Sequence, residues 1–497
     1  MPKKLPLLYS ALMLTAVNLI LRFAGTSFQV YLSSRIGAAG IGLLQLVMSV
    51  GSLAMVAGIG GIRTATMYLT AEELGKGCTG NVSWVLSACF AYSILFSGTV
   101  AALLYHFAPQ IALYWIGDNR TIEALRLFAA FLPVTCLCGV MTGYFTAANR
   151  IGTLAAVEVA EQLCSMALTL ALLALRAGND PMQACMCVIL GSSLGACLTL
   201  SCLVFLRSRE KIPAGNPLPI RKRLLHTALP LAIGDDLKSG INTTENLMVP
   251  KRLALYPLID NPLAAFGLVS GMVFPVIMFP AAILFGLAEL LIPELARCTA
   301  AGSRKRINYL AGKSLRFAMI YGIVFAGLIF LGSDTLCLKL YGNSDAAIWM
   351  RRYGLLIPML YCDAITDAMT KGLGQQTACV RYNIVTSFLD VVFLFFLLPR
   401  YGMTGYYISF LITHLLNFSL SLNRLMKITE HRIPLHIPLL SMTANCFSIW
   451  AASFTTGFLI RGICYLLILG STLFLLKILD HNDIRWIRGL IWKKTSP

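Results

Sequence analysis

The sequence predicts an all-α polytopic membrane protein with about fourteen transmembrane helices, arranged as two pseudo-symmetric six-helix lobes plus two C-terminal helices. Three observations support this prediction: the composition, the recurrence of long apolar runs, and an internal repeat. Hydrophobic residues make up 57% of the 497 residues and charged residues only 12%, with a mean hydropathy of +0.75. Because a soluble protein carries about 25% charged residues, the composition excludes a soluble globular fold.

Apolar runs of about twenty residues recur along the whole length, and each can cross roughly 30 Å of hydrocarbon. The predicted spans lie near 5–32, 40–70, 82–107, 122–148, 153–176, 183–206, 224–249, 265–292, 313–340, 348–373, 379–398, 404–424, 438–459 and 462–479.

The net charge of +18 is distributed asymmetrically along the chain. With the N terminus inside, the inner connections and the tail hold Lys3, Lys4, Arg207, Arg209, Lys211, Arg221, Lys222, Arg223, Arg304, Lys305, Arg306, Lys427, Arg432, Arg485, Arg488, Lys493 and Lys494. This positive-inside bias predicts a multi-pass protein of the cytoplasmic membrane with both termini in the cytoplasm. We interpret the surplus as a topology signal and a contact for anionic membrane lipids, and expect no nucleic-acid partner.

Motifs of common catalytic and metal sites are absent from the sequence. Most of the fifteen cysteines lie in predicted spans and none forms a CxxC pair, so we interpret them as packing residues. No Walker-type GxxxxGK[ST], HExxH or nucleophile elbow occurs, and the predicted outer loops are short. The sequence therefore predicts a transporter rather than an enzyme, with no metal site and no cofactor beyond a coupling Na⁺ or H⁺.

The second half of the chain repeats the first. A shift of 224 residues places Cys138, Thr142, Thr146 and Thr153 over Cys362, Thr366, Thr370 and Thr377, and a shift of 225 places Gly42 and Gly61 over Gly267 and Gly286. The repeat unit holds about six spans, so both copies enter the membrane in the same direction. We expect a six-helix lobe at 1–207, a basic cytoplasmic linker at 208–223, a second lobe at 224–426, and two extra helices with a basic tail at 427–497.

Polar residues form a stripe along the first span. Thr15, Asn18, Arg22, Thr26 and Gln29 fall within an arc of about 80° on a helix. A guanidinium at mid-bilayer costs about 2.5–3.5 kcal/mol, so it should face protein or a hydrated cavity. We therefore expect Asn18, Arg22, Thr26 and Gln29 to contact a polar substrate. Arg63, which follows three glycines, either guards the inner mouth of that cavity or extends to the cytoplasm.

The seventh span carries a second stripe, made of Asp235, Lys238, Asn242 and Glu245, with Asp236 beside it. We assign Lys238 and Asn242 to substrate binding and the carboxylates to ion coupling, and we expect Pro230, Gly234 and Gly240 to bend or unwind this helix. The alternative is that Asp235 and Lys238 only pair with each other.

Further carboxylates lie on the tenth and eleventh spans. Asp363, Asp367 and Asp390 could bind a hard cation or carry a proton. The alternatives are an ordinary ion pair between Asp367 and Lys371 and a position of Asp390 near a membrane surface. We interpret Glu158 and Glu161, on the fifth span, as structural.

Five segments together resemble the stage V sporulation protein B / polysaccharide biosynthesis protein group of the multidrug/oligosaccharidyl-lipid/polysaccharide (MOP) exporter superfamily, which also contains MATE-like transporters. They are IGAAGIGLLQLVMSV from Ile36, GYFTAANR from Gly143, NLMVPKRLA from Asn246, GLVSGMVFPVIMFPAAILFGLAELLIPELA from Gly267, and KGLGQQ from Lys371.

The resemblance implies two six-helix lobes around a central cavity lined mainly by spans one, two, seven and eight, which alternates between inward-open and outward-open forms. In the flippase branches, cationic cavity residues contact the diphosphate of undecaprenyl-pyrophosphate-linked sugars, and Arg22 is the residue placed to do so here. The drug-exporting relatives often use cavity carboxylates, whereas the first span of this chain has no acid.

Two functions from this superfamily follow as hypotheses. The first is a flippase or exporter that moves a lipid-linked oligosaccharide or cell-wall precursor across the cytoplasmic membrane by alternating access, working as a monomer with a lipid-linked glycan and membrane lipids as partners. The alternative is a cation-coupled multidrug or organic-cation antiporter of the MATE type. A membrane enzyme is the third reading, and the absence of catalytic motifs argues against it.

Overall fold

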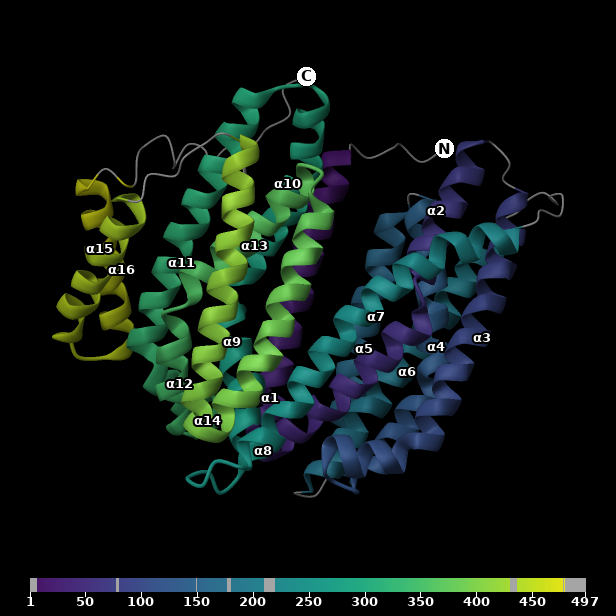
Figure 1. Cartoon of the computed structure of the whole chain (residues 1–497), viewed down its shortest axis with the longest axis horizontal. Helices are drawn as coiled ribbons and strands as arrows, with labels where there is room; N and C mark the ends of the chain where they lie inside the picture. The colour runs from purple at the N-terminus through teal and green to yellow at the C-terminus, as the bar shows by residue number, and fades with distance from the viewer. Residues whose placement is uncertain are drawn as a thin grey trace. The chain divides into compact units, whose positions relative to one another are not determined.

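The computed structural model describes residues 7–76, 80–148, 150–176, 180–209, 220–429, 436–476 and 478, and within these ranges every regular element is helical (Figure 1). Eight of the described helices are long and apolar enough to cross a membrane, or nine if one bent helix pair counts as a span. The all-α polytopic fold predicted from the sequence is confirmed, while the count of fourteen spans stays a prediction.

The helices follow the predicted spans closely. Their bounds are α1 Leu7–Ile59, α2 Ile62–Gly75, α3 Asn81–Gln110, α4 Thr121–Ala147, α5 Ile151–Arg176, α6 Pro181–Ser208, α7 Ile220–Leu253, α8 Pro262–Gly267, α9 Phe274–Met278, α10 Ala281–Ala300, α11 Arg304–Tyr341, α12 Asp345–Gly354, α13 Ile357–Gly372, α14 Gln376–Thr429, α15 His436–Ser453 and α16 Phe458–Leu475, with short π-helices η1 (Ile111–Ile116) and η2 (Leu268–Val273).

Two of these helices each cover two predicted spans, joined at a glycine. In α1 the backbone leaves the helical region at Gly37 (φ 70°, ψ 177°), and in α14 it does so at Gly402 (φ 56°, ψ −138°). A positive φ is readily adopted only by glycine. The chain therefore turns at these points with almost no loop.

The sequence predicted that the seventh span bends or unwinds, and the unwinding is wrong. All of α7, from Ile220 to Leu253, is helical, including the stretch that holds Pro230, Gly234 and Gly240. A proline inside a helix removes one backbone donor and crowds one carbonyl, which a packed helix tolerates.

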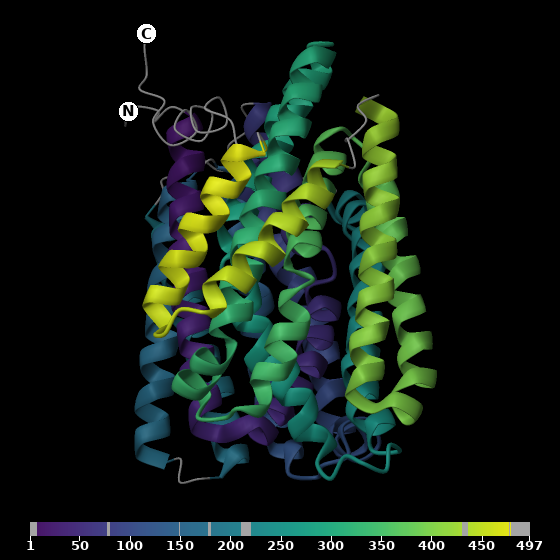
Figure 2. The ribbon, with the colours of Figure 1, turned by 90° about the vertical axis from the view of Figure 1, so that its left-hand side faces the viewer.

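The structure divides into two compact units. One comprises Met1–Gly271 with Asp390–Tyr406, and the other comprises Met272–Leu389 with Tyr407–Pro497. In the first unit α1 packs on α7 and α8, and α4 packs on α3 and α6. In the second unit α13 packs on α10 and α11, and α15 and α16 pack together and against α11 (Figure 2).

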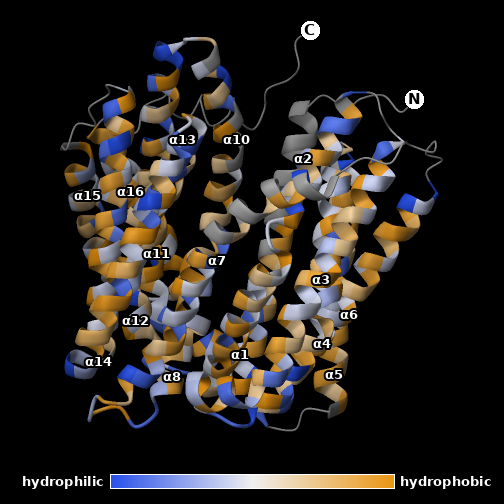
Figure 3. Cartoon of the chain, turned by 45° about the vertical axis from the view of Figure 1, so that its right-hand side comes forward, coloured by the Kyte–Doolittle hydropathy of each residue, from blue (hydrophilic) through white to orange (hydrophobic). Residues whose placement is uncertain are grey.

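Apolar side chains cover the outside of the helices as well as their contacts. Leu175, Leu258 and Leu475 are about four-fifths exposed, and Trp84, Tyr105 and many other large apolar side chains are also exposed. Figure 3 shows hydrophobic residues along the length of the helices and many hydrophilic residues near their ends. Such a surface is stable when the solvent around it is lipid.

Equivalent positions of the predicted repeat adopt the same local structure. The Thr146 hydroxyl donates to the Thr142 carbonyl at 2.7 Å, and the Thr370 hydroxyl donates to the Thr366 carbonyl at 2.7 Å. A further pair of equivalent residues is in contact, because a Cβ on Gly267 would lie 2.6 Å from the Gly42 nitrogen. The repeat itself stays a prediction, because threonines outside the paired positions, such as Thr386 and Thr413, make the same bond to the carbonyl four residues back.

Candidate functional site

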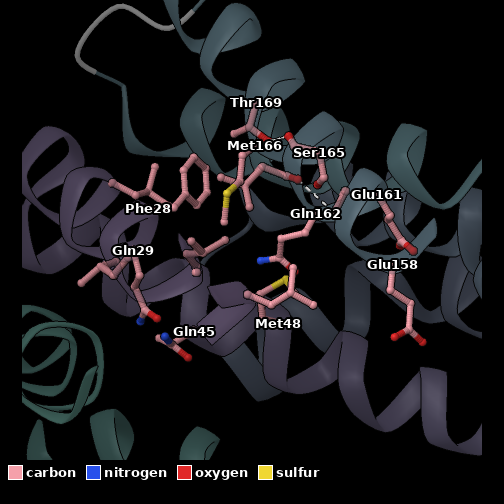
Figure 4. A pocket seen from close by; sticks show the side chains of 17 residues that line it. Phe28, Gln29, Gln45, Met48, Glu158, Glu161, Gln162, Ser165, Met166 and Thr169 are labelled. Atoms are coloured by element: carbon pink, nitrogen blue, oxygen red, sulfur yellow. Dashed lines mark hydrogen bonds between the residues drawn. The ribbon is translucent and has the colours of Figure 1, made fainter. Parts of the chain in front are cut away.

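A cavity of about 650 Å³ lies among α1, α5 and α6 in the first unit. We call it the glutamine cavity, after Gln29, Gln45 and Gln162. Its other polar lining residues are Glu158, Glu161, Ser165, Thr169 and Ser192. Figure 4 shows the Gln162 side chain in the middle of the cavity and the two glutamates at one end.

The sequence of α5 explains this lining. Glu158, Glu161, Gln162, Ser165 and Thr169 follow one another at intervals of three, one, three and four residues. This spacing places all five on one helix face. The polar face of α5 is thus turned toward the cavity.

Both halves of α1 contribute to the same cavity. Gln29 precedes the turn at Gly37 and Gln45 follows it, so the turn brings the two carboxamides to one cavity. Gly25 lies beside the α5 side chain, since a Cβ there would make ordinary contact with Gln162 Nε2 at 3.5 Å.

Three hydroxyl groups at or beside the cavity donate their protons within the protein. Thr199 Oγ1 donates to Glu161 Oε2 at 2.8 Å, and Thr169 Oγ1 donates to the Ser165 carbonyl at 2.8 Å. Ser192 Oγ donates to the Val188 carbonyl at 3.0 Å. Among the side chains that the structure describes, none that lines the cavity is a lysine, arginine or histidine; the Arg22 side chain lies outside the described residues.

A second cavity, of about 390 Å³, lies among α1, α2 and α7. We call it the Arg63–Lys238 cavity; Thr64, Asp235, Ser239 and Asn242 also line it. The helix breaks between α1 and α2 at Gly60 (φ 49°) and Gly61 (φ 69°), and Arg63 follows directly. The structure therefore brings together four predicted site residues, Arg63, Asp235, Lys238 and Asn242, from segments about 180 residues apart.

An electrostatic interaction joins one residue of each cavity. Arg63 of the second cavity interacts electrostatically with Glu158 of the first. The glutamine cavity thus contributes two carboxylates, while the Arg63–Lys238 cavity contributes two cations and the Asp235 carboxylate.

The remaining predicted carboxylates of the first unit lie away from these cavities. Glu245 of α7 and Asp390 of α14 are in side-chain hydrogen-bonding contact, and both interact electrostatically with the buried Tyr406. Asp236 interacts electrostatically with Tyr92 of α3, and its Oδ1 atom is buried.

The other two predicted carboxylates belong to the second unit. Asn417 Nδ2 donates to Asp363 Oδ2 at 3.2 Å. Lys371 Nζ lies 2.6 Å from Asp367 Oδ2, which is the ordinary i,i+4 ion pair that the sequence left open as an alternative.

The first-span prediction is resolved only in part. The side chains of Asn18 and Arg22 lie outside the described residues. Gln29 lines the glutamine cavity, whereas Thr26 is not among the residues recorded for either cavity.

Glu158 and Glu161, interpreted as structural from the sequence, both line the larger cavity. The signal that identifies them is the polar face of the fifth span, which continues through Gln162, Ser165 and Thr169.

Comparison with known proteins adds to this geometry. Residues 15–171 match the MatE family. The chain is also 20% identical, over 410 residues, to stage V sporulation protein B of Bacillus subtilis (strain 168), and the alignment covers 80% of this chain and 79% of that protein.

Solved structures with a similar fold include the following three proteins. The lipid II flippase MurJ in an inward closed conformation gives a TM-score of 0.70 at 14% identity, over 97% of this chain and 100% of that chain. An inward-facing multidrug resistance MATE family transporter of the MOP superfamily gives 0.66 at 12% identity, over 84% and 100%. A MOP superfamily transporter from Pyrococcus furiosus Vc1 (DSM3638) gives 0.62 at 12% identity, over 85% and 96%.

Proposed function

We propose that this chain is a flippase for a lipid-linked oligosaccharide or cell-wall precursor of the undecaprenyl-pyrophosphate type. The chain belongs to the MOP superfamily of membrane transporters and is not an enzyme. The observation that carries the proposal is the Arg63–Lys238 cavity, where two cations and the Asn242 carboxamide face one space. Similarity to stage V sporulation protein B and the fold of a lipid II flippase support the same substrate class.

The residue types of this cavity suit a diphosphate. A guanidinium presents a planar fork of donors that matches phosphate oxygens, and an ammonium adds a point charge. Asp235 reduces the net positive charge of the lining. A carrier has to release its substrate, so we assign Asp235 the role of limiting how tightly the anion is held. Arg22 joins this set as a proposal from the sequence.

Coupling to Na⁺ or H⁺ forms part of the proposal. The contact between the Glu245 and Asp390 carboxyls supports it, because two adjacent carboxyls share a proton or a cation. Asp363, held by Asn417, is the corresponding candidate in the second unit.

The charge distribution sets the expected topology and assembly. We assign the protein to the cytoplasmic membrane with both termini inside, as its basic connections predict. Both cavities are built within one unit of one chain, and this favours a monomer as the transporting unit.

A second candidate function is a cation-coupled multidrug or organic-cation antiporter. The observation that favours it is the pair Glu158 and Glu161, whose carboxylates line a cavity with no basic residue recorded among its lining. Under this function Arg63 and Lys238 would be dispensable for transport.

Proteoliposomes loaded with a fluorescent lipid-diphosphate sugar test the proposal. We expect the protein to speed its appearance on the opposite leaflet, and Arg63→Gln, Lys238→Gln and Arg22→Ala each to slow it about tenfold or more, since a charged hydrogen bond contributes about 1.5–3 kcal/mol. Lys339→Gln, on the exposed end of α11, is the matched control.

Two outcomes decide between the candidates. Flipping no faster than in empty vesicles contradicts the flippase. Efflux of an organic cation that survives Arg63→Gln but is lost in Glu161→Gln establishes the antiporter instead.

A further inference from the structure

The glutamine cavity offers its ligand more acceptors than donors. While they are ionised, Glu158 and Glu161 only accept hydrogen bonds and donate none. The Thr169 and Ser192 hydroxyls already donate to carbonyls of their own helices, so each presents lone pairs to the cavity. A ligand rich in donors fits such a lining.

The described part of the lining carries two carboxylates and no basic side chain. Thr199 supplies Glu161 with a neutral donor, and the cation that interacts with Glu158 is Arg63, which lines the neighbouring cavity. If a bound anion also contacts Arg63, the Glu158 carboxylate shares its counter-ion with that anion. A second positive charge on the other side of the carboxylate then stabilises it. The ligand that satisfies both cavities therefore has an anionic part and a cationic part.

We propose that the glutamine cavity binds the sugar end of the lipid-diphosphate substrate and that this sugar carries a free, positively charged amino group. The diphosphate then lies against Arg63 and Lys238, and the ammonium donates to Glu158 and Glu161. This proposal rests on the proposed flippase function and narrows its substrate to amino sugars that lack an N-acyl group.

The rest of the lining suits a sugar better than a drug-like cation. Gln29, Gln45 and Gln162 each offer a carbonyl and an NH₂ group, the combination that hydroxyl groups require. Phe28 also lines the cavity, and the face of its ring suits the C–H groups or the ammonium of such a sugar. The volume of about 650 Å³ lies in the usual range for small-molecule sites.

Two probes that differ only in the amino group test the proposal. They are short-chain polyprenyl diphosphates bearing either glucosamine or N-acetylglucosamine, measured for binding to the full-length protein in detergent and for flipping in proteoliposomes near neutral pH. We expect the glucosamine lipid to bind about tenfold more tightly, the lower end of what an ammonium–carboxylate contact provides.

The variants are judged by the ratio of the two affinities, because a general loss of folded protein lowers both and leaves the ratio unchanged. Glu158→Gln and Glu161→Gln should each reduce the preference, and the double variant should bring the ratio close to one. Arg63→Gln should weaken both lipids alike. Glu123→Gln, at the exposed start of α4, makes the same chemical change outside both cavities and should keep the full preference.

The outcomes separate this proposal from the function on which it rests. Equal handling of the two lipids by the unaltered protein, or a preference that persists in the double variant, overturns the amino-sugar assignment and leaves the flippase standing. If neither lipid binds or is flipped, the flippase fails and the assignment fails with it.

Discussion

At the residue scale, one ion pair outside the membrane spans has a defined pH dependence. Asp118 and Arg120 lie in the turn between η1 and α4, with Arg120 Nη2 2.7 Å from Asp118 Oδ2. The Arg120 backbone nitrogen also donates to Asp118 Oδ1 at 2.9 Å. Hydrogen bonding to the guanidinium lowers the pKa of the Asp118 carboxyl below its ordinary value.

A lowered folded-state pKa means that the Asp118 carboxylate stabilises the fold above the ordinary aspartate pKa of about 3.9 and ceases to do so as the pH falls through the folded value. Asp118→Asn should lower the free energy of unfolding at neutral pH by at most about 1 kcal/mol, since Arg120 is largely exposed. The loss of stability below about pH 4 should become shallower. Thermal unfolding in detergent measures both effects, with Asp260→Asn in an exposed loop as control; an unchanged acid limb contradicts the assignment.

Individual site residues were predictable to different degrees. The spacing of Asp235, Lys238 and Asn242 places them on one face of one helix, and that face does line a cavity. The same reasoning was available for the polar face that holds Glu158 and Glu161. Helix periodicity tells which residues share a face but not what the face meets, so the partner of Glu245, 145 residues away at Asp390, required the fold.

At the element scale, hydropathy predicted where the spans lie but did not predict where their helices are broken. Gly60 and Gly61 break a run that is apolar throughout, and Phe279–Pro280 separates α9 from α10 by a bend of 64°. A window average cannot register such breaks, because backbone hydrogen bonding changes there while side-chain hydropathy does not. The opposite error occurred in α7, where proline and glycine suggested an unwound segment and the backbone is helical throughout.

The two C-terminal helices dock on α11 through an apolar cluster that contains one buried hydroxyl, that of Tyr465. Tyr465 of α16 is fully buried, and its hydroxyl lies 2.8 Å from Asn445 Oδ1 of α15 and 3.1 Å from the Ile323 carbonyl of α11. Gly327 makes room for the ring, because a Cβ there would lie 2.6 Å from Tyr465 Cε2. One side chain thus joins three helices.

Tyr465→Phe should therefore destabilise the docking of α15 and α16 by about 1 kcal/mol, the usual scale for a hydrogen bond between membrane helices. It leaves the Asn445 carbonyl buried without its donor. Hydrogen exchange should increase in α15 and α16 before other helices. Tyr309→Phe, on the exposed face of α11, removes the same hydroxyl group elsewhere and should leave exchange unaltered; matching exchange in both variants refutes the docking role.

At the scale of the whole molecule, the repeat predicted from the sequence leads to a prediction about the contact between two equivalent glycines. Equivalent threonines in α4 and α13 make the same bond to their own helices. The contact of Gly42 with its own counterpart Gly267 adds a different kind of evidence. Because a residue touches its equivalent next to a local two-fold axis, the predicted repeat places such an axis between the α1 segment after Gly37 and α8.

Close approach at this axis requires that both residues lack a Cβ atom. A Cβ on Gly42 would lie 3.3 Å from Gly267 Cα and clash with the Leu263 carbonyl, while a Cβ on Gly267 would clash with the Ala38 carbonyl. These neighbours are backbone atoms, which cannot rotate away. Gly42→Ala and Gly267→Ala should therefore each cost about 1–3 kcal/mol, the usual penalty of overpacking.

Gly98→Ala and Gly240→Ala provide the matched comparison, because a Cβ at either position meets nothing within 4 Å. Alanine is favoured over glycine in a helix by about 0.5–1 kcal/mol, so these controls should be neutral or stabilising. Thermal unfolding of the four variants then isolates the axis contact. Since Gly42 and Gly267 press on each other, the double alanine variant should not lose the sum of the two single losses, as neighbouring sites couple. Additive losses would mean that the two glycines act through separate contacts and not through one shared axis.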